Sequence, residues 1–183
     1  MEKKITLPLT KELAKTLHAG DSVLVTGTIY TSRDAGHKRM CEAVSKGEPL
    51  PFDIKDATIY YVGPCPHRDG EIIGSCGPTT SYRMDAYSPL LISMGLLSMI
   101  GKGERNDEVK QAIANHGGVY FAAIGGAGAL LAQHVEKSEI IAYHDLGTEA
   151  IHKLTVKDFP VTVVIDSTGA DLYEEGKKIF CEN

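Results

Sequence analysis

Short apolar runs rich in β-branched and aromatic residues alternate along the chain with segments of helical character, and this alternation limits the possible folds more than any other feature. The runs cover residues 5–9, 22–30, 57–62, 119–124, 140–143 and 162–166. Between them we expect helices at residues 10–19, 34–45, 88–98, 106–116 and 125–135. Strands that alternate with helices are typical of α/β domains. The sequence therefore predicts an α/β domain with a mixed central sheet flanked by helices, and a hairpin in its last third.

Composition and local signals agree with one globular domain over residues 1–183. The chain is 43% hydrophobic, which is enough apolar material for a substantial core. Thr10 is placed to cap the first helix, and glycines at positions 20, 47 and 117 follow three of the expected helices. No internal repeat or long linker divides the chain.

Charge and hydropathy exclude some classes of partner. The formal net charge of −5 gives no electrostatic reason to bind nucleic acid or an anionic membrane surface. Residues 88–101 and 119–132 are the longest apolar segments, and glycines or polar residues interrupt both before they reach the roughly 18–20 residues of a membrane span. The first ten residues turn polar too early for a signal peptide. We expect a cytoplasmic protein without a nucleic-acid or membrane partner.

The cysteines are Cys41, Cys65, Cys76 and Cys181. Their spacing matches no CxxC pair, zinc-finger pattern or ferredoxin run. The simplest interpretation is four reduced thiols, mostly buried. A metal site formed by Cys65, His67 and Cys76 is a weaker alternative.

Residues 64–89 form a long segment dense in Gly, Pro, Cys, Thr and Ser, and such a segment inside a compact domain is usually functional or disordered. It contains the run GPTTSYRMD, with hydroxyls at Thr79 and Thr80 and a cation at Arg83. If residues 79–83 are helical, Thr79 and Arg83 share a face and could bind an anionic substrate. A helix cap without chemistry explains the same residues equally well.

Three other segments could also bind anions. Arg33, in the run TSRDAGHKR, follows a strand and begins a helix, and its guanidinium suits a carboxylate or phosphate. Lys102 lies between two glycines. Residues 125–128 are small but lack the GxGxxG spacing of a nucleotide site, so close packing or an amide-lined anion site is the better interpretation. A solvated helix start at Arg33 and a helix end at Lys102 stay open as alternatives.

Taken in order, these segments resemble a known family. TSRDAGHKR is similar to its T-A-R-D-A-A-H-K-R segment, GPTTSYRMD to its G-P-T-T-S-x-R-M-D segment, and MIGKG to its lysine loop. LGTEAIHKLTVKDFPVTVVID is similar to its carboxyl-terminal signature. Across essentially its whole length the chain resembles the β subunit, or carboxyl-terminal half, of the class I fumarase and tartrate dehydratase family of iron–sulfur hydro-lyases.

The resemblance implies a fold, a reaction and a partner. The fold would be a swivelling β/β/α domain. The reaction would be reversible loss of water from a 2-hydroxydicarboxylate, with (S)-malate to fumarate expected first and tartrate to oxaloacetate or a mesaconate reaction as alternatives. A 4Fe–4S cluster would be held by a separate α subunit, and this chain would be active only with that subunit, in an α₂β₂ hetero-oligomer or with a homodimer of this half.

The resemblance also implies roles for individual residues. Arg33 and Arg83 would bind the substrate carboxylates with help from Lys102, because cations aimed at developing negative charge stabilise the transition state. Thr79 would act as the base, assisted by nearby cations, and Thr80 would position substrate. No residue of this chain would bind metal.

Asp34 and His37 would orient Arg33 or contact the partner. Two positions depart from the family pattern: Tyr82 replaces a small residue, and His152 replaces a frequent tryptophan. Both leave the reaction class intact and bear on the choice of substrate. A binding module that keeps the fold without the reaction, and a small zinc enzyme using Cys65 and its neighbours, are the competing interpretations.

Overall fold

The computed structural model describes residues 2–181, and it describes side chains for residues 2–178. The strands are β1 (Lys3–Thr6), β2 (Ser22–Thr31), β3 (Thr58–Tyr60), β4 (Ser98–Gly101), β5 (Val119–Ala122), β6 (Val135–Ala142) and β7 (Ile151–Ile165). The α-helices are α1 (Lys11–Ala14), α2 (Asp34–Ser45), α3 (Ser88–Ser93), α4 (Asp107–His116), α5 (Gly128–Ala132) and α6 (Leu172–Cys181). Two 3₁₀ segments, η1 (Ser81–Met84) and η2 (His144–Glu149), complete the described elements. None of the helices is long and apolar enough to cross a membrane.

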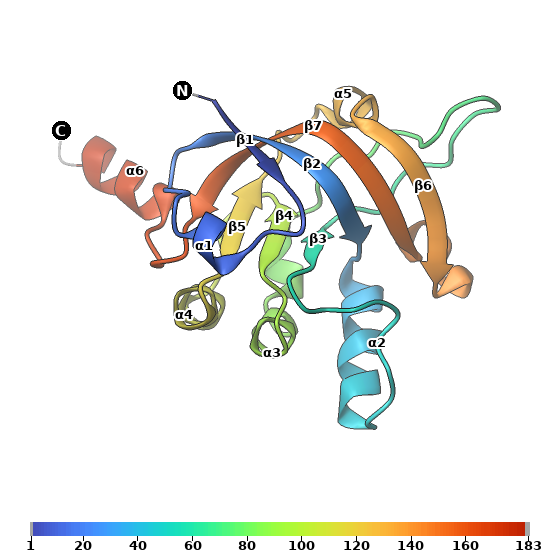
Figure 1. The fold of residues 1–183 in the computed structure, drawn as a ribbon, viewed down its shortest axis with the longest axis horizontal. Coiled ribbons are helices and arrows are strands. Elements are labelled where there is room, and N and C mark those ends of the chain that lie inside the picture. Colours follow the sequence, from blue (N-terminus) through green and yellow to red (C-terminus); the bar gives the residue numbers. More distant parts are fainter. Residues whose placement is uncertain (1, 182–183) are drawn as a thin grey trace.

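A mixed sheet forms the centre of the molecule, with strand order β1-β2-β3-β4-β5-β7-β6. The pairs β1–β2, β2–β3, β3–β4 and β4–β5 are parallel. Strand β7 runs antiparallel to β2, β5 and β6. Because β7 pairs with both β2 and β5, strands β2, β3, β4, β5 and β7 form a closed sheet, and β1 and β6 extend it (Figure 1). The expected mixed sheet with flanking helices is confirmed.

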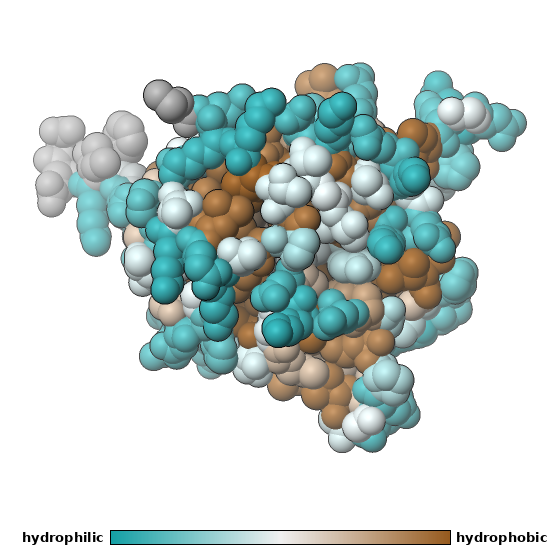
Figure 2. All heavy atoms as spheres, viewed as in Figure 1, coloured by the Kyte–Doolittle hydropathy of each residue, from teal (hydrophilic) through white to brown (hydrophobic). Residues whose placement is uncertain are grey.

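Two hydrophobic clusters lie on opposite sides of the strands. One cluster takes side chains from every strand of the closed sheet, including Ile29, Tyr60 and Phe159. The other packs the alternate side chains, such as Ile59 and Met99, against α2, α3 and α4. Figure 1 shows these three helices together on one side of the sheet. In the face drawn in Figure 2, hydrophobic residues gather in the lower centre, near the positions of α3 and α2, below a mainly hydrophilic upper rim.

Several predicted elements agree with the structure. Strand β2 and helix α2 lie where the sequence predicts them, within a residue. Helix α4 begins after Asn106, whose Oδ1 accepts a hydrogen bond from Val109 N at 2.9 Å, and it ends at Gly117 in the left-handed conformation. The first helix is shorter than expected, although Thr10 caps it as predicted.

Other predictions about the elements are wrong. The predicted helix over 88–98 ends at Ser93, because Gly95 takes a φ of 112° that a helix cannot contain, and Ser98 begins the unpredicted strand β4. The predicted helix over 125–135 spans only Gly128–Ala132, and Val135 already belongs to β6. Residues 151–161 extend the predicted last strand into the long β7, and α6 was not predicted at all.

Candidate active site

The predicted site residues lie at one edge of the sheet, beyond the carboxyl ends of three neighbouring parallel strands. Arg33 follows β2, Lys102 follows β4, and Thr79 is anchored next to β3 by a 2.8 Å hydrogen bond from its amide to the Tyr61 carbonyl. In α/β folds, both with open sheets and with closed ones, ligands collect at the carboxyl ends of the parallel strands. The fold therefore brings together segments that are far apart in the sequence.

The segment with Thr79 and Arg83 is bonded to the segment with Lys102. We call residues 77–85 the threonine–arginine turn and residues 102–106 the lysine loop. Thr80 and Lys102 form a parallel bridge. The Ser81 amide donates to the Lys102 carbonyl at 2.9 Å, and the Lys102 amide donates to Ser81 Oγ at 3.0 Å. These bonds fix the backbone of the two segments relative to each other.

The local conformation differs from the helix considered for residues 79–83. Only Ser81–Met84 form a 3₁₀ turn, and Thr80 is extended at φ −67° and ψ 125°, so Thr79 and Arg83 do not share one helical face. The close approach of the turn to β4 requires glycine at position 101, because a Cβ there would lie 2.0 Å from Ser81 Oγ. Strand β4 therefore helps to shape the site, because the glycine at its end lets the turn pack closely against it.

Arg33 extends from the start of α2 and pairs with a residue that sequence reasoning missed. One terminal nitrogen of its guanidinium lies 3.3 Å from Glu149 Oε1 in η2, and both side chains are 25% exposed. Arg33 Nε is buried and has no hydrogen-bond partner among the described residues. The guanidinium is thus held at its tip, while the Nε–H donor has no partner among the described residues.

Asp34 contacts the other arginine of the site. Its Oδ2 lies 3.7 Å from an Arg83 guanidinium nitrogen, and the two side chains are 41% and 47% exposed. Asp34 was predicted to support Arg33 or a partner contact, but its ion pair in this structure joins α2 to the threonine–arginine turn. At this distance and exposure the pair is weak, so Arg83 loses little free energy when it leaves Asp34.

His37 is completely buried on the first turns of α2. Its Nδ1 lies 3.1 Å from the Arg33 carbonyl and 2.8 Å from Ser32 Oγ. Burial lowers the pKa of His37 to about 4, so the ring is neutral near pH 7. His37 therefore holds the backbone that carries Arg33 and does not face an incoming substrate.

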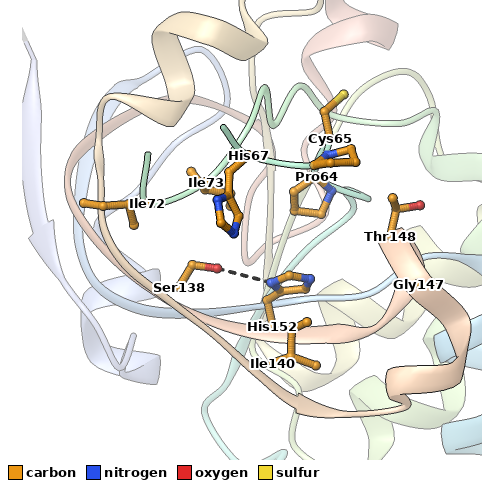
Figure 3. Close-up of a pocket in the computed structure, with 11 residues that line it drawn as sticks. Pro64, Cys65, His67, Ile72, Ile73, Ser138, Ile140, Gly147, Thr148 and His152 are labelled. Carbon is orange, nitrogen blue, oxygen red and sulfur yellow. Dashed lines mark hydrogen bonds between the residues drawn. The ribbon is translucent and has the colours of Figure 1, made fainter. Parts of the chain in front are cut away.

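The two departures from the family pattern are placed differently. Tyr82 is 64% exposed and faces outward. His152 is half-buried on β7, where its Nδ1 lies 3.2 Å from Ser138 Oγ of β6, and burial lowers its pKa. His152 lines a mainly apolar cavity of about 260 Å³. His67 lines the same cavity and lies across it from His152 (Figure 3). Arg33, Thr79, Arg83 and Lys102 do not line this cavity.

The cysteines differ in how deeply they are buried. Cys76 is buried and its pKa is raised to about 12 by burial, whereas Cys65 is exposed and Cys41 is half-buried. The expectation of mostly buried thiols thus fits Cys76 alone among these three, and the side chain of Cys181 lies outside the described residues. Within residues 2–178 no three His, Cys, Asp or Glu side chains are arranged to hold a metal ion, so this part of the chain offers no ligand set for the zinc alternative.

A buried ion pair beneath the site was also missed by sequence reasoning. Asp85, the last residue of the GPTTSYRMD run, pairs with Arg105 of the lysine loop at 2.6 Å. The motif could have pointed to Asp85, but nothing in the local sequence distinguishes Arg105 from a surface charge.

Comparison with known proteins identifies the class. Residues 1–176 match the family model described as Fumarase C-terminus. The chain is 43% identical over 161 residues to "Fumarate hydratase class I, anaerobic" of Escherichia coli strain K12, which is 87% of this chain and 29% of that protein. It is 39% identical over 179 residues to "Putative L(+)-tartrate dehydratase subunit beta" of Methanocaldococcus jannaschii, which is 94% of this chain and 92% of that protein.

These relatives, a fumarate hydratase and a tartrate dehydratase subunit, are hydro-lyases. The chain belongs to the Fumarase C-terminus family. It spans between 27% and 34% of the length of the fumarate hydratases that it matches, and the share is 28% for "Fumarate hydratase 1, mitochondrial" of Leishmania major.

Proposed function

We propose that residues 1–183 act as a single β-type domain of a hydro-lyase that reversibly dehydrates a 2-hydroxydicarboxylate together with a separate α-type subunit. The observation that carries the proposal is the meeting of Arg33, the threonine–arginine turn and Lys102 at one edge of the sheet. Support for the division into subunits comes from the relative named as a β subunit, which the chain matches over nearly the full length of both.

Two arginines whose segments meet at this edge suit a substrate with two carboxylates. The Arg33 side chain is 25% exposed, and the described ion pair of Arg83, to Asp34, is long at 3.7 Å. Each guanidinium presents a planar set of donors that matches a carboxylate. Removal of a proton beside a carboxylate builds negative charge on that group, so fixed cations lower the barrier most where this charge develops.

Thr79 is assigned as the base and Thr80 as a positioning donor. A threonine hydroxyl accepts a proton poorly unless its deprotonated form is stabilised by nearby cations. Lys102 is bonded through its backbone to the same turn, and its ammonium lies beside Gly125, where an added Cβ would be 4.0 Å from Nζ. Lys102 and Arg83 are therefore the cations that we assign to stabilise the Thr79 oxygen.

The described residues of this chain do not fit a 4Fe–4S cluster, because no suitable set of ligands is gathered in them. We therefore assign the cluster to the α-type subunit. The assembly we propose is α₂β₂, with a homodimer of this half as the alternative, in the cytoplasm.

(S)-Malate and fumarate are the substrates that we propose first, because several class I fumarate hydratases match the chain at 42–43% identity. Tartrate is the second candidate, because the relative of matching length is named for it. A non-catalytic binding module remains the alternative to any hydro-lyase activity.

The test is to co-express this chain with its α-type subunit, load the cluster anaerobically, and assay malate, fumarate and tartrate against each chain alone. We expect turnover only from the complex. Thr79→Ala should lower kcat by about 10²–10⁴-fold, the usual loss on removing a general base. Arg83→Lys should mainly raise KM, because lysine keeps the charge but not the paired donors.

Tyr82→Phe is the matched control, since the Tyr82 side chain lies in the same turn but faces outward. It should leave kcat and KM within about twofold of wild type, as expected for a surface substitution. Activity from this chain alone would contradict the shared site, and full activity of Thr79→Ala would remove Thr79 from the mechanism. A cluster-loaded complex that turns over none of the three substrates would favour the binding module.

A further inference from the structure

We propose that Asp85 and Arg105 are positioning residues that hold the lysine loop against the threonine–arginine turn, and so set where Lys102 lies relative to Thr79 and Arg83. Arg105 lies three residues after Lys102, and Asp85 lies two residues after Arg83. Their side chains therefore join the two segments that carry the proposed catalytic groups. This inference rests on the proposed function for its consequence in catalysis, but not for its structural content.

The Asp85–Arg105 ion pair is buried, and most of its polar atoms are hydrogen-bonded. Arg105 Nε donates to Asp85 Oδ1 at 2.6 Å, with side-chain exposures of 0% and 7%. The other Asp85 oxygen accepts from the Asn106 amide at 2.8 Å, and an Arg105 terminal nitrogen donates to Ser88 Oγ at 2.8 Å. We call this ion pair with its bonds to Ser88 and Asn106 the Asp85–Arg105 clip.

The guanidinium of the clip also lies against two tyrosine rings that reach the site. Its central carbon is 5.2 Å from the Tyr61 ring centre and 5.0 Å from that of Tyr120. The Tyr61 carbonyl accepts from the Thr79 amide. The Tyr120 hydroxyl lies 2.9 Å from Ser81 Oγ, which accepts from the Lys102 amide. Arg105 is thus one contact away from the anchors of both Thr79 and Lys102.

Stability alone is a weak explanation for such a pair. Removing two charges from water costs about as much as their attraction returns, and well-packed apolar residues in place of buried ion pairs are often neutral or stabilising. An Arg–Asp pair differs from an apolar contact in its direction, since the fork and the carboxylate fit in few geometries. In an active site, a misplacement of about 1 Å in a catalytic group can lower the rate about 10²-fold. A directional ion pair is therefore useful there, because it holds the two segments in one relative position.

The first experiment needs no catalysis and compares Arg105→Lys, Asp85→Asn and wild type by amide hydrogen exchange on the full chain. The clip predicts that the amides of Thr79, Ser81 and Lys102 exchange at least roughly tenfold faster in both variants, beyond any change in β2 and β7, because local openings become easier. Arg39→Lys is the matched control, because Arg39 and Asp145 form an exposed pair of the same type, with side chains 39% and 63% exposed. It should leave these three amides unchanged.

The second experiment measures kcat and KM in the cluster-loaded complex. Both clip variants should lower kcat by about 30–100-fold with KM within about threefold, since the groups remain but their mutual placement is lost. The double variant should be no slower than the slower single variant, because the two residues act as one unit. If either variant is not recovered folded, Ser88→Ala, which removes one acceptor of Arg105, should show the same pattern to a smaller degree.

Unchanged exchange at Thr79, Ser81 and Lys102, or the same acceleration throughout β2 and β7, would overturn the clip as a positioning device. So would unaltered kcat in an active complex. A wild-type complex without turnover on any dicarboxylate would instead count against the proposed function. In that case local acceleration of the three amides would still support the clip.

Discussion

At the scale of single residues, His37 ties the acid stability of the chain to the site. It is packed against Tyr61 and Tyr87, has the Arg105 and Asp34 charges nearby, and bonds to Ser32 and the Arg33 carbonyl. Its pKa is about 4 in the folded chain because burial disfavours the charged ring, against an ordinary value of 6.5. The unfolded chain therefore binds a proton between these values that the folded chain does not, and stability falls as pH decreases from about 6.5 to about 4.

We predict that His37→Asn removes this part of the acid sensitivity, because the asparagine amide can replace Nδ1 as a donor without titrating. Between pH 7 and pH 4.5 the wild type should lose about 2 kcal/mol more unfolding free energy than the variant. Urea denaturation at a series of pH values measures the difference. Parallel curves for the two proteins would show that His37 does not carry the effect.

Most of the proposed site could be predicted from its residues, but the contacts beneath it could not. Arg33, Thr79, Arg83 and Lys102 lie in short motifs, and the structure gathers their segments at one edge. Arg105 has no such local signal, because its burial depends on Tyr120 of β5 and on Tyr61, which directly follows β3.

At the scale of elements, α4 follows the lysine loop and is closed at both ends by its sequence. The Asn106 side chain caps its first turn, while the Asn106 backbone amide binds Asp85. Asn106→Ala should therefore cost about 1 kcal/mol of unfolding free energy through loss of the cap, leaving the backbone bond in place. Chemical denaturation measures this cost.

Gln111→Ala, at an exposed position in the middle of the same helix, is the control and should be neutral or slightly stabilising. Equal stability of Asn106→Ala and wild type would mean that the lysine loop, and not the cap, determines where α4 begins.

Strand β4 and the first part of β7 were missed because their strand conformation depends on pairing with distant strands. The apolar run before Gly101 has no clear period, so a buried helix and a central strand look alike until the neighbouring strands β3 and β5 are known. The first part of β7 contains charged residues and Pro160, which argue against a strand. It is a strand because β6 pairs with residues 151–156 and β2 pairs with residues 153–162.

At the scale of the whole molecule, we expect the chain to unfold as one unit, because its central sheet is closed. Its central cluster combines side chains from Ile5 to Val163, so few parts have a core of their own. We predict a single thermal transition, with the same midpoint by near-ultraviolet and far-ultraviolet circular dichroism. Two separated midpoints would instead divide residues 1–183 into independent units.

A substitution at Phe159 measures how much this shared core contributes to the unfolding free energy. Phe159 is completely buried and meets Tyr60 edge-to-face at 5.4 Å between ring centres. Phe159→Ala should cost about 3–5 kcal/mol in denaturant unfolding, as expected for a large aromatic core residue. Leu90→Ala, at a side chain 41% exposed on α3, should cost far less. Similar losses for both would show that the closed sheet does not carry the main core.

The pairing of β2 with β7 also has a consequence for synthesis. Ser22 pairs with Thr162, so the sheet closes between strands that are far apart in the sequence, and β2 is synthesised well before β7. At about 5–20 residues per second, β2 waits several seconds or more on the ribosome without its partner. During that time its edge can pair with other chains, and a chaperone that covers residues 22–31 until β7 emerges would protect the nascent protein from aggregation.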